Sequence, residues 1–262
     1  MDLLESLLAG FAAWLPVFVR VATFIFATPL FGRGVPPQTR AGFATFLALL
    51  LTGAVPLSDV PQDLAGYLLV IVEEVGVGLA MGLVVSMVVS AVYLAGQLLD
   101  IPIGFSMVNV FDPEAGIQTP VLSQFHYVIA ILVLFGANGH HALLRALADS
   151  FALFPPGAAW NAAASLDAAL AGFARMFELG VRIALPVIGA LFLVDVALGI
   201  VARAVPQVNV FFVGFPLKIG LGIALLILTL PVYAGFAAYL FGGGGEMIQS
   251  LYRMMSAIGA SR

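Results

Sequence analysis

The chain has 262 residues, of which 62% are hydrophobic and 9% are charged, and its mean hydropathy is +1.13. This composition is far more apolar than that of an average soluble domain and predicts a membrane protein. A net charge of −4 with scattered lysines and arginines excludes nucleic-acid binding. Because the chain has no cysteine, disulfides, thiolate metal sites and cysteine nucleophiles are excluded as well.

Continuous apolar runs recur along the chain and predict helices. A transmembrane β-strand alternates polar and apolar positions, whereas these runs are uninterrupted and rich in alanine and leucine. We therefore predict an all-α fold, a membrane-associated bundle of about six apolar helical segments arranged as helical hairpins. The expected segments are 8–31, 41–56, 66–99, 121–137, 180–201 and 217–241.

Two of these segments have lengths that do not suit a simple bilayer crossing. The second has roughly 16 residues, whereas a spanning helix needs about 20. The third would be roughly 50 Å long as one helix, against about 30 Å of hydrocarbon. We therefore expect part of the bundle to pack against protein outside the lipid.

The third segment carries small residues at every fourth position: Gly78, Gly82, Ser86 and Ser90. This spacing places them on one helix face and lets another backbone approach closely. We interpret the face as a helix-packing surface, either within the chain or between subunits.

The basic residues near the first and last loops predict their orientation. Arg33 and Arg40 flank the first loop, and Arg203 and Lys218 flank the last, so we expect both loops to face the cytoplasm. Three arginines then fall on the opposite side and weigh against this orientation: Arg145, Arg175 and Arg182.

Charged residues inside apolar runs are costly and normally have a buried partner or an aqueous path. Arg20 and Asp195 are the two clearest cases. We expect both to be buried, and each fits a structural ion pair, an intersubunit contact or a proton relay. Glu73 and Glu74 open the third segment, where the helix dipole favours acidic residues.

No catalytic motif accompanies the three histidines. His126, His140 and His141 occur without a metalloprotease, nucleophile-elbow, phosphate-loop or paired-carboxylate pattern. His140 and His141 follow Gly139 in what we predict to be a loop, where they are solvated or capping residues and not metal ligands. We predict no enzymatic activity, no cofactor and no metal site.

The loop 100–116 lies between two long apolar segments and is itself apolar in its middle. Irregular backbone cannot face hydrocarbon, because its unpaired polar groups each cost several kcal/mol, so this loop lies against protein or lines a cavity. Uncharged side chains that can seal a gap fill its centre: Phe105, Met107, Val108, Val110 and Phe111. Residues with turn and hinge properties bracket them: Pro102, Gly104, Pro113 and Gly116.

Several spaced motifs, taken together, resemble the FliR family of flagellar export-gate proteins and its relatives in virulence type III secretion. No single motif is diagnostic, but their order and spacing extend over nearly the whole chain. The matching residues are Arg20, Pro29, Leu30, Phe31, Gly32, Val35, Pro36, Glu74, Gly78, Gly82, Ala95, Gly96, Asp100, Gly104, Asp112, Pro113, Gly139, His140, Ser150, Phe151, Pro155, Asp195, Arg203, Pro206, Gln207, Asn209, Pro216 and Lys218.

A second resemblance covers the last third of the chain. The stretch PQVNVFFVGFPLKIG resembles the hairpin turn of the companion subunit FliQ. The resemblance implies a FliP-like helical part at 1–175, including the loop 100–116, and a FliQ-like hairpin with a C-terminal tail at 176–262. It assigns subunit contacts at the turn to Gln207, Asn209, Pro216 and Lys218, with Lys218 at the start of the returning helix.

The family resemblance implies a non-enzymatic subunit of the flagellar type III protein export gate. It implies a multi-pass protein of the bacterial inner membrane and flagellar basal body, with FliP-like, FliQ-like, FlhB-like and FlhA-like partners. Unfolded export substrates and membrane lipid are further expected contacts. We hypothesise that the loop 100–116 plugs the pore, with static packing as the alternative. A secondary transporter or ion channel of an unrelated family is the alternative function, motivated by Arg20, Asp195 and the glycine and proline interruptions.

Overall fold

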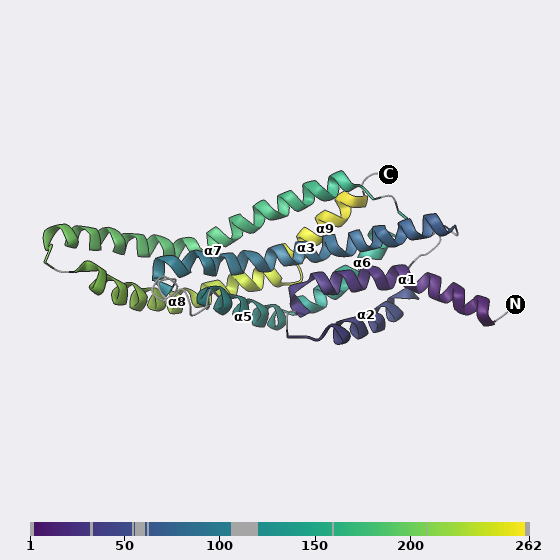
Figure 1. Cartoon of the computed structure of the whole chain (residues 1–262), viewed down its shortest axis with the longest axis horizontal. Coiled ribbons are helices and arrows are strands. Elements are labelled where there is room, and N and C mark those ends of the chain that lie inside the picture. Colours follow the sequence, from purple (N-terminus) through teal and green to yellow (C-terminus); the bar gives the residue numbers. More distant parts are fainter. Residues whose placement is uncertain are drawn as a thin grey trace, which may run out of the picture. The chain divides into compact units, whose positions relative to one another are not determined.

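The computed structural model describes residues 3–31, 34–53, 55, 61, 63–105, 120–158, 160–207 and 209–259. Within these ranges every regular element is a helix, which confirms the all-α prediction for this part of the chain (Figure 1). The elements are α1 (Leu3–Ala27), the 3-10 helix η1 (Pro29–Phe31), α2 (Pro37–Thr52), α3 (Leu64–Ile103), α5 (Val121–Gly136), α6 (Gly139–Leu153), α7 (Ala162–Ala204), α8 (Val210–Phe241) and α9 (Glu246–Gly259).

Two helices, α6 and α9, lie outside the six predicted segments. Both are short and amphipathic, so they lack the continuous apolar runs on which the prediction rested. In α9, buried residues such as Met247, Leu251 and Met255 recur at helical spacing, and they alternate with exposed polar positions. The glycine run 242–245 forms a hydrogen-bonded turn in which the N–H of Gly245 donates to the carbonyl oxygen of Gly242 (2.9 Å).

Length and composition qualify several helices as membrane spans. Four helical stretches in the described part of the chain are long and apolar enough to cross a membrane: 9–27, 64–103, 163–204 and 212–259. The pair α5 and α6 makes a fifth if it forms one span. The helix α2 has 16 residues and is short for a crossing, as the sequence predicts. The chain is therefore a helical membrane protein.

The chain divides into two compact units, and α3 and α7 each run through both. The first unit comprises Met1–Val88, Ala137–Phe173 and Leu240–Arg262, and in it α1 packs on α2 and α6 packs on α9. The second comprises Val89–Gly136 and Ala174–Tyr239. Its core is formed by Ala95, Leu99, Ile103, Leu122, Ala184, Val187 and Leu191.

The predicted division at residue 176 falls inside the continuous helix α7. It rests on resemblance to two companion subunits, whereas the compact units reflect which segments pack together. A division by packing does not test a division by resemblance. The FliP-like part at 1–175 and the FliQ-like part at 176–262 therefore stay a prediction.

Candidate functional site

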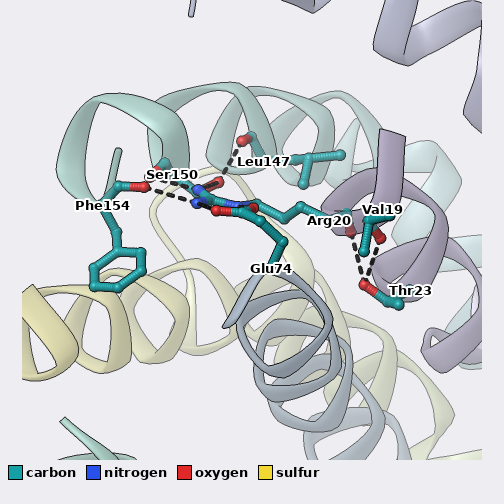
Figure 2. A network of polar contacts seen from close by, with 7 residues as sticks. All are labelled: Val19, Arg20, Thr23, Glu74, Leu147, Ser150 and Phe154. Atoms are coloured by element: carbon teal, nitrogen blue, oxygen red, sulfur yellow. Dashed lines mark hydrogen bonds and ion pairs between the residues drawn. The ribbon is translucent and has the colours of Figure 1, made fainter. Parts of the chain in front are cut away.

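Arg20 has no exposed surface and is surrounded by acceptors in the first unit (Figure 2). Its Nε and Nη2 donate to the two carboxylate oxygens of Glu74, with 2.7 Å between Nη2 and Oε1. Its Nη1 donates to the carbonyl oxygen (3.0 Å) and to Oγ (3.2 Å) of Ser150. Nη2 also donates to the carbonyl oxygen of Phe154 (2.8 Å), and the ring centroid of Phe151 lies 4.2 Å from the guanidinium carbon.

These contacts engage all five N–H donors of the guanidinium. The carbonyl groups of Ser150 and Phe154 lie at the C-terminal end of α6, where the helix dipole favours a cation. The carbonyl oxygen of Ser150 also accepts the backbone N–H of Phe154 (2.8 Å). Arg20 thus joins α1, α3 and α6 at one point. The guanidinium group has no donor left for a substrate. Among the structural ion pair, the intersubunit contact and the proton relay considered for Arg20, this geometry favours the structural ion pair.

Glu74 is the partner that sequence reasoning missed. The structure buries it fully, ten residues after Leu64, the first residue of α3. The explanation by the helix dipole is therefore wrong for Glu74, because that effect is confined to the first turn. The sequence does contain a signal for this pair. Arg20 and Glu74 carry opposite charges and each lies inside an apolar segment, where a charged residue needs a partner.

The small-residue face of α3 contacts α1 within the first unit. A Cβ atom on Gly78 would lie 2.6 Å from a backbone carbonyl oxygen of α1, and one on Gly82 would overlap the side chain of Ala27. The Oγ of Ser86 donates to the carbonyl oxygen of Ala27 (2.8 Å). Ser90, the fourth member, is exposed. The first three residues thus allow close packing within the chain.

Asp195 forms an ion pair with Lys218 in the second unit, with 2.7 Å between Oδ1 and Nζ. Its side chain is 48% exposed and that of Lys218 is 20% exposed. The expectation that Asp195 is buried is therefore wrong within this chain. The physical reason is that this part of α7 faces outward, as the exposed side chains of Phe192 and Val196 also show.

The turn between α7 and α8 is shorter than predicted. Gln207 and Asn209 are exposed in it, but Pro216 and Lys218 lie inside α8, which begins at Val210. The expectation that Lys218 starts the returning helix is therefore wrong. The apolar run begins before Pro216, and proline inside an apolar helix of this kind is tolerated because neighbouring groups satisfy the freed backbone.

The last turn of α3 and the first turn of α5 flank the predicted plug loop. Gly104 has a φ of +105°, which glycine adopts readily, and it follows the last residue of α3. The carboxylate of Asp100 accepts a hydrogen bond from the backbone N–H of Leu122 (3.1 Å), so it ties the first turn of α5 to α3. Pro102 lies in the last turn of α3, and Phe105 packs against the core of the second unit.

The remaining plug and hinge residues lie outside the described residues: Met107, Val108, Val110, Phe111, Pro113 and Gly116. Their closing role stays a prediction.

Two of the three histidines do not lie in the loop that the sequence predicts for them. His140 and His141 belong to the first turn of α6, so the prediction of a loop there is wrong. Asn138, with a left-handed φ of 56°, precedes α6, so only Ala137 and Asn138 separate this helix from Gly136, the end of α5. Among the described residues, no group of three or more histidine or acidic residues is placed to hold a metal ion.

The fold and the site define a class: an all-helical membrane protein with an internal ion pair and outward-facing apolar helices. Residues 11–243 match the model of the bacterial export proteins, family 1. The flagellar biosynthetic protein FliR of Bacillus subtilis (strain 168) is 37% identical over 265 residues, which cover 98% of this chain and all of the relative. The protein of that name from Escherichia coli (strain K12) is 31% identical over 87% of this chain and 90% of its own length. The one from Aquifex aeolicus (strain VF5) is 28% identical over 82% and 84%.

These matches extend over most of the chain and decide against an unrelated transporter or channel family. The chain belongs to the FliR family of flagellar export proteins. Membership of this family makes it a component of the flagellar export apparatus.

Proposed function

We propose that this chain is a non-enzymatic subunit of the flagellar export gate. In this proposal it lies in the bacterial inner membrane at the flagellar basal body and forms the core of the export pore with FliP-like and FliQ-like subunits. FlhB-like and FlhA-like proteins adjoin it, and unfolded substrates pass through the pore.

The observation that carries the proposal is the uncovered apolar surface of α7 and α8. In the apolar windows that qualify Ala163–Ala204 and Phe212–Gly259 as candidate spans, 17% and 11% of the residues are buried within the chain, compared with 56% for Leu64–Ile103. Side chains such as Phe192, Phe212 and Leu228 are 64%, 74% and 74% exposed. A surface of this kind needs lipid or partner subunits to cover it.

The ion pair of Asp195 and Lys218 indicates that the surface around it is covered by partner subunits and not by lipid. Asp195 precedes Ala204, the end of α7, by nine residues, and Lys218 follows Val210, the start of α8, by eight. At about 1.5 Å per residue both lie roughly 13 Å from the turn, near the middle of about 30 Å of hydrocarbon. Partly exposed charges at that depth favour contact with protein or an aqueous path.

We further propose that Phe105, Met107, Val108, Val110 and Phe111 close the pore at rest, with the flanking hinges allowing the loop to move aside. The support is the apolar sequence of the loop together with its framed ends. Asp100 anchors one end to the other, and Gly104 permits the change of direction after α3.

Copurification tests the subunit assignment. The tagged chain, co-expressed with FliP-like and FliQ-like proteins and extracted in mild detergent, is expected to elute with both. Elution as a lone monomer or homodimer would contradict the assignment.

Deletion of residues 106–110 tests the closing loop. The assembled complex is expected to form, and cells are expected to leak ions and small solutes, measured as membrane conductance. An assembled deletion complex with unchanged conductance would refute closure, whereas loss of assembly would favour static packing of the loop.

A further inference from the structure

A cavity of about 290 Å³ opens among α3, α5, α7 and α8 in the second unit. Most of its lining is apolar and comes from Leu99, Ile183, Pro186, Val187, Leu226 and Phe236. Ligand pockets typically measure about 300–1,000 Å³, so this cavity is at the small end of the range and has room for a stretch of one hydrocarbon chain and not for a whole lipid. We call it the α7–α8 groove.

The two hydroxyl groups that line the groove already have partners inside the protein. The hydroxyl group of Tyr233 donates to the carbonyl oxygen of His126 (2.8 Å). That of Thr229 donates to the carbonyl oxygen of Leu225 one turn earlier (2.8 Å). Because these donors are engaged, the groove offers an occupant mainly apolar contact, and a hydrogen-bonding ligand would gain little there.

Arg182 lines the rim of the groove and is 64% exposed. Its Nη2 is 2.8 Å from Oε1 of Glu178, whose other oxygen is 2.6 Å from Nη1 of Arg175. Two guanidinium groups thus share the one carboxylate of Glu178. A guanidinium group with free donors on its exposed side is well suited to a phosphate group.

The position along the hairpin places Arg182 at a membrane surface. Arg182 precedes the end of α7 by 22 residues, and Val232, which also lines the groove, follows the start of α8 by 22. At about 1.5 Å per residue this is roughly 33 Å, close to the thickness of the hydrocarbon core. With the 205–209 turn at one surface, Arg182 lies at the other, beside the groove, and the α7 part of the lining continues from it toward the turn at Ile183, Pro186 and Val187.

We propose that the α7–α8 groove binds one acyl chain of an anionic phospholipid, with the lipid phosphate paired to Arg182. An arginine suits this headgroup because its planar guanidinium group can donate two parallel hydrogen bonds to phosphate oxygens. The apolar lining, the engaged hydroxyl groups, the exposed guanidinium group and its position along the hairpin match one lipid that stands with its headgroup at Arg182. This site is independent of the export role.

Native mass spectrometry of the full chain tests the proposal. The detergent-purified protein is incubated with phosphatidylglycerol or with phosphatidylcholine of the same acyl chains. We expect about fivefold greater retention of phosphatidylglycerol, the effect of one basic residue near an anionic headgroup. Arg182→Gln is expected to abolish this preference. Arg203→Gln, which removes the same charge near the other end of α7, is expected to keep it.

A second variant tests the acyl-chain part. Leu226→Trp fills the groove and is expected to lower retention of both lipids, with helicity and elution volume as checks on folding. If that variant misfolds, Val232→Trp at the exposed rim supplies the same block.

Three results would overturn the proposal: equal retention of the two lipids, an unchanged preference in Arg182→Gln, or an equal loss in Arg203→Gln. Absence of phosphatidylglycerol from the chain copurified with its partner subunits would also overturn it, and would assign the groove to a subunit contact.

Discussion

The guanidinium group of Arg20 and the carboxylate of Glu74 form a two-point ion pair with no exposed surface, although 54 residues separate them in the chain. Since the same guanidinium also binds the end of α6, one side chain fixes the register of three helices. A buried charge is tolerated only when its partners are complete, so the pair is strongly sensitive to the loss of either member.

Arg20→Ala is expected to lower the free energy of unfolding by about 3–5 kcal/mol, because Glu74 would be left buried and unpaired. Denaturant titration in detergent measures this change, and impaired assembly with partner subunits is expected to follow. The double variant Arg20→Met with Glu74→Leu removes both charges and is expected to recover most of the loss. Arg203→Ala, an exposed arginine, serves as the control. A loss below about 1 kcal/mol in Arg20→Ala, the size typical of exposed pairs, would contradict the structural role.

Gly78→Ala is expected to destabilise the protein by about 1–3 kcal/mol, because its Cβ would meet the rigid backbone of α1. Gly189 in α7 is the matched control, because a Cβ atom there would point into open space among the described residues. Gly189→Ala is expected to be neutral or to stabilise the helix by about 0.5–1 kcal/mol. Equal melting temperatures for the two variants would argue against close packing at Gly78.

Asp195→Ala is expected to change the stability of the isolated chain by less than about 1 kcal/mol, because the pair with Lys218 is partly exposed. In the assembled complex the loss is expected to be larger, since partner subunits would bury the unpaired Lys218. The comparison requires melting curves of the chain alone and of the copurified complex. An equally small effect in both would place the pair on a surface that no partner covers.

Asp100→Ala is expected to cost about 0.5–2 kcal/mol, as for the loss of a helix N-terminal cap, because the backbone N–H of Leu122 would lose its acceptor. Asp100→Asn keeps an acceptor oxygen at the same place and is expected to cost less. Amide hydrogen exchange at the start of α5 measures the difference. Identical protection in both variants would show that this hydrogen bond does not hold the base of the loop.

Cysteine at position 209 reports the orientation of the hairpin in this cysteine-free chain. Asn209→Cys is exposed in the 205–209 turn and is expected to react with an impermeant thiol reagent from the cytoplasmic side only. Ala130→Cys, at a fully buried position, is the unreactive control. Labelling from the outside alone would reverse the predicted topology.

The sequence by itself determined the helical membrane class, the approximate position of the apolar segments and the family. These properties are local: a continuous apolar run has to form a helix in lipid whatever it packs against, and the family motifs are read residue by residue. The spacing of Gly78, Gly82 and Ser86 likewise predicted a close-packing face before any partner was known.

Only the tertiary structure decided which helices meet. The short amphipathic helices α6 and α9 lack a continuous apolar run, so their apolar residues indicate a helix only once a neighbour covers them. Glu74 and Asp195 are both acidic residues in apolar segments. Glu74 is buried in an ion pair with Arg20, whereas Asp195 is partly exposed in an ion pair with Lys218. Burial depends on the faces that distant helices present, and the residues adjacent in the chain do not encode that arrangement.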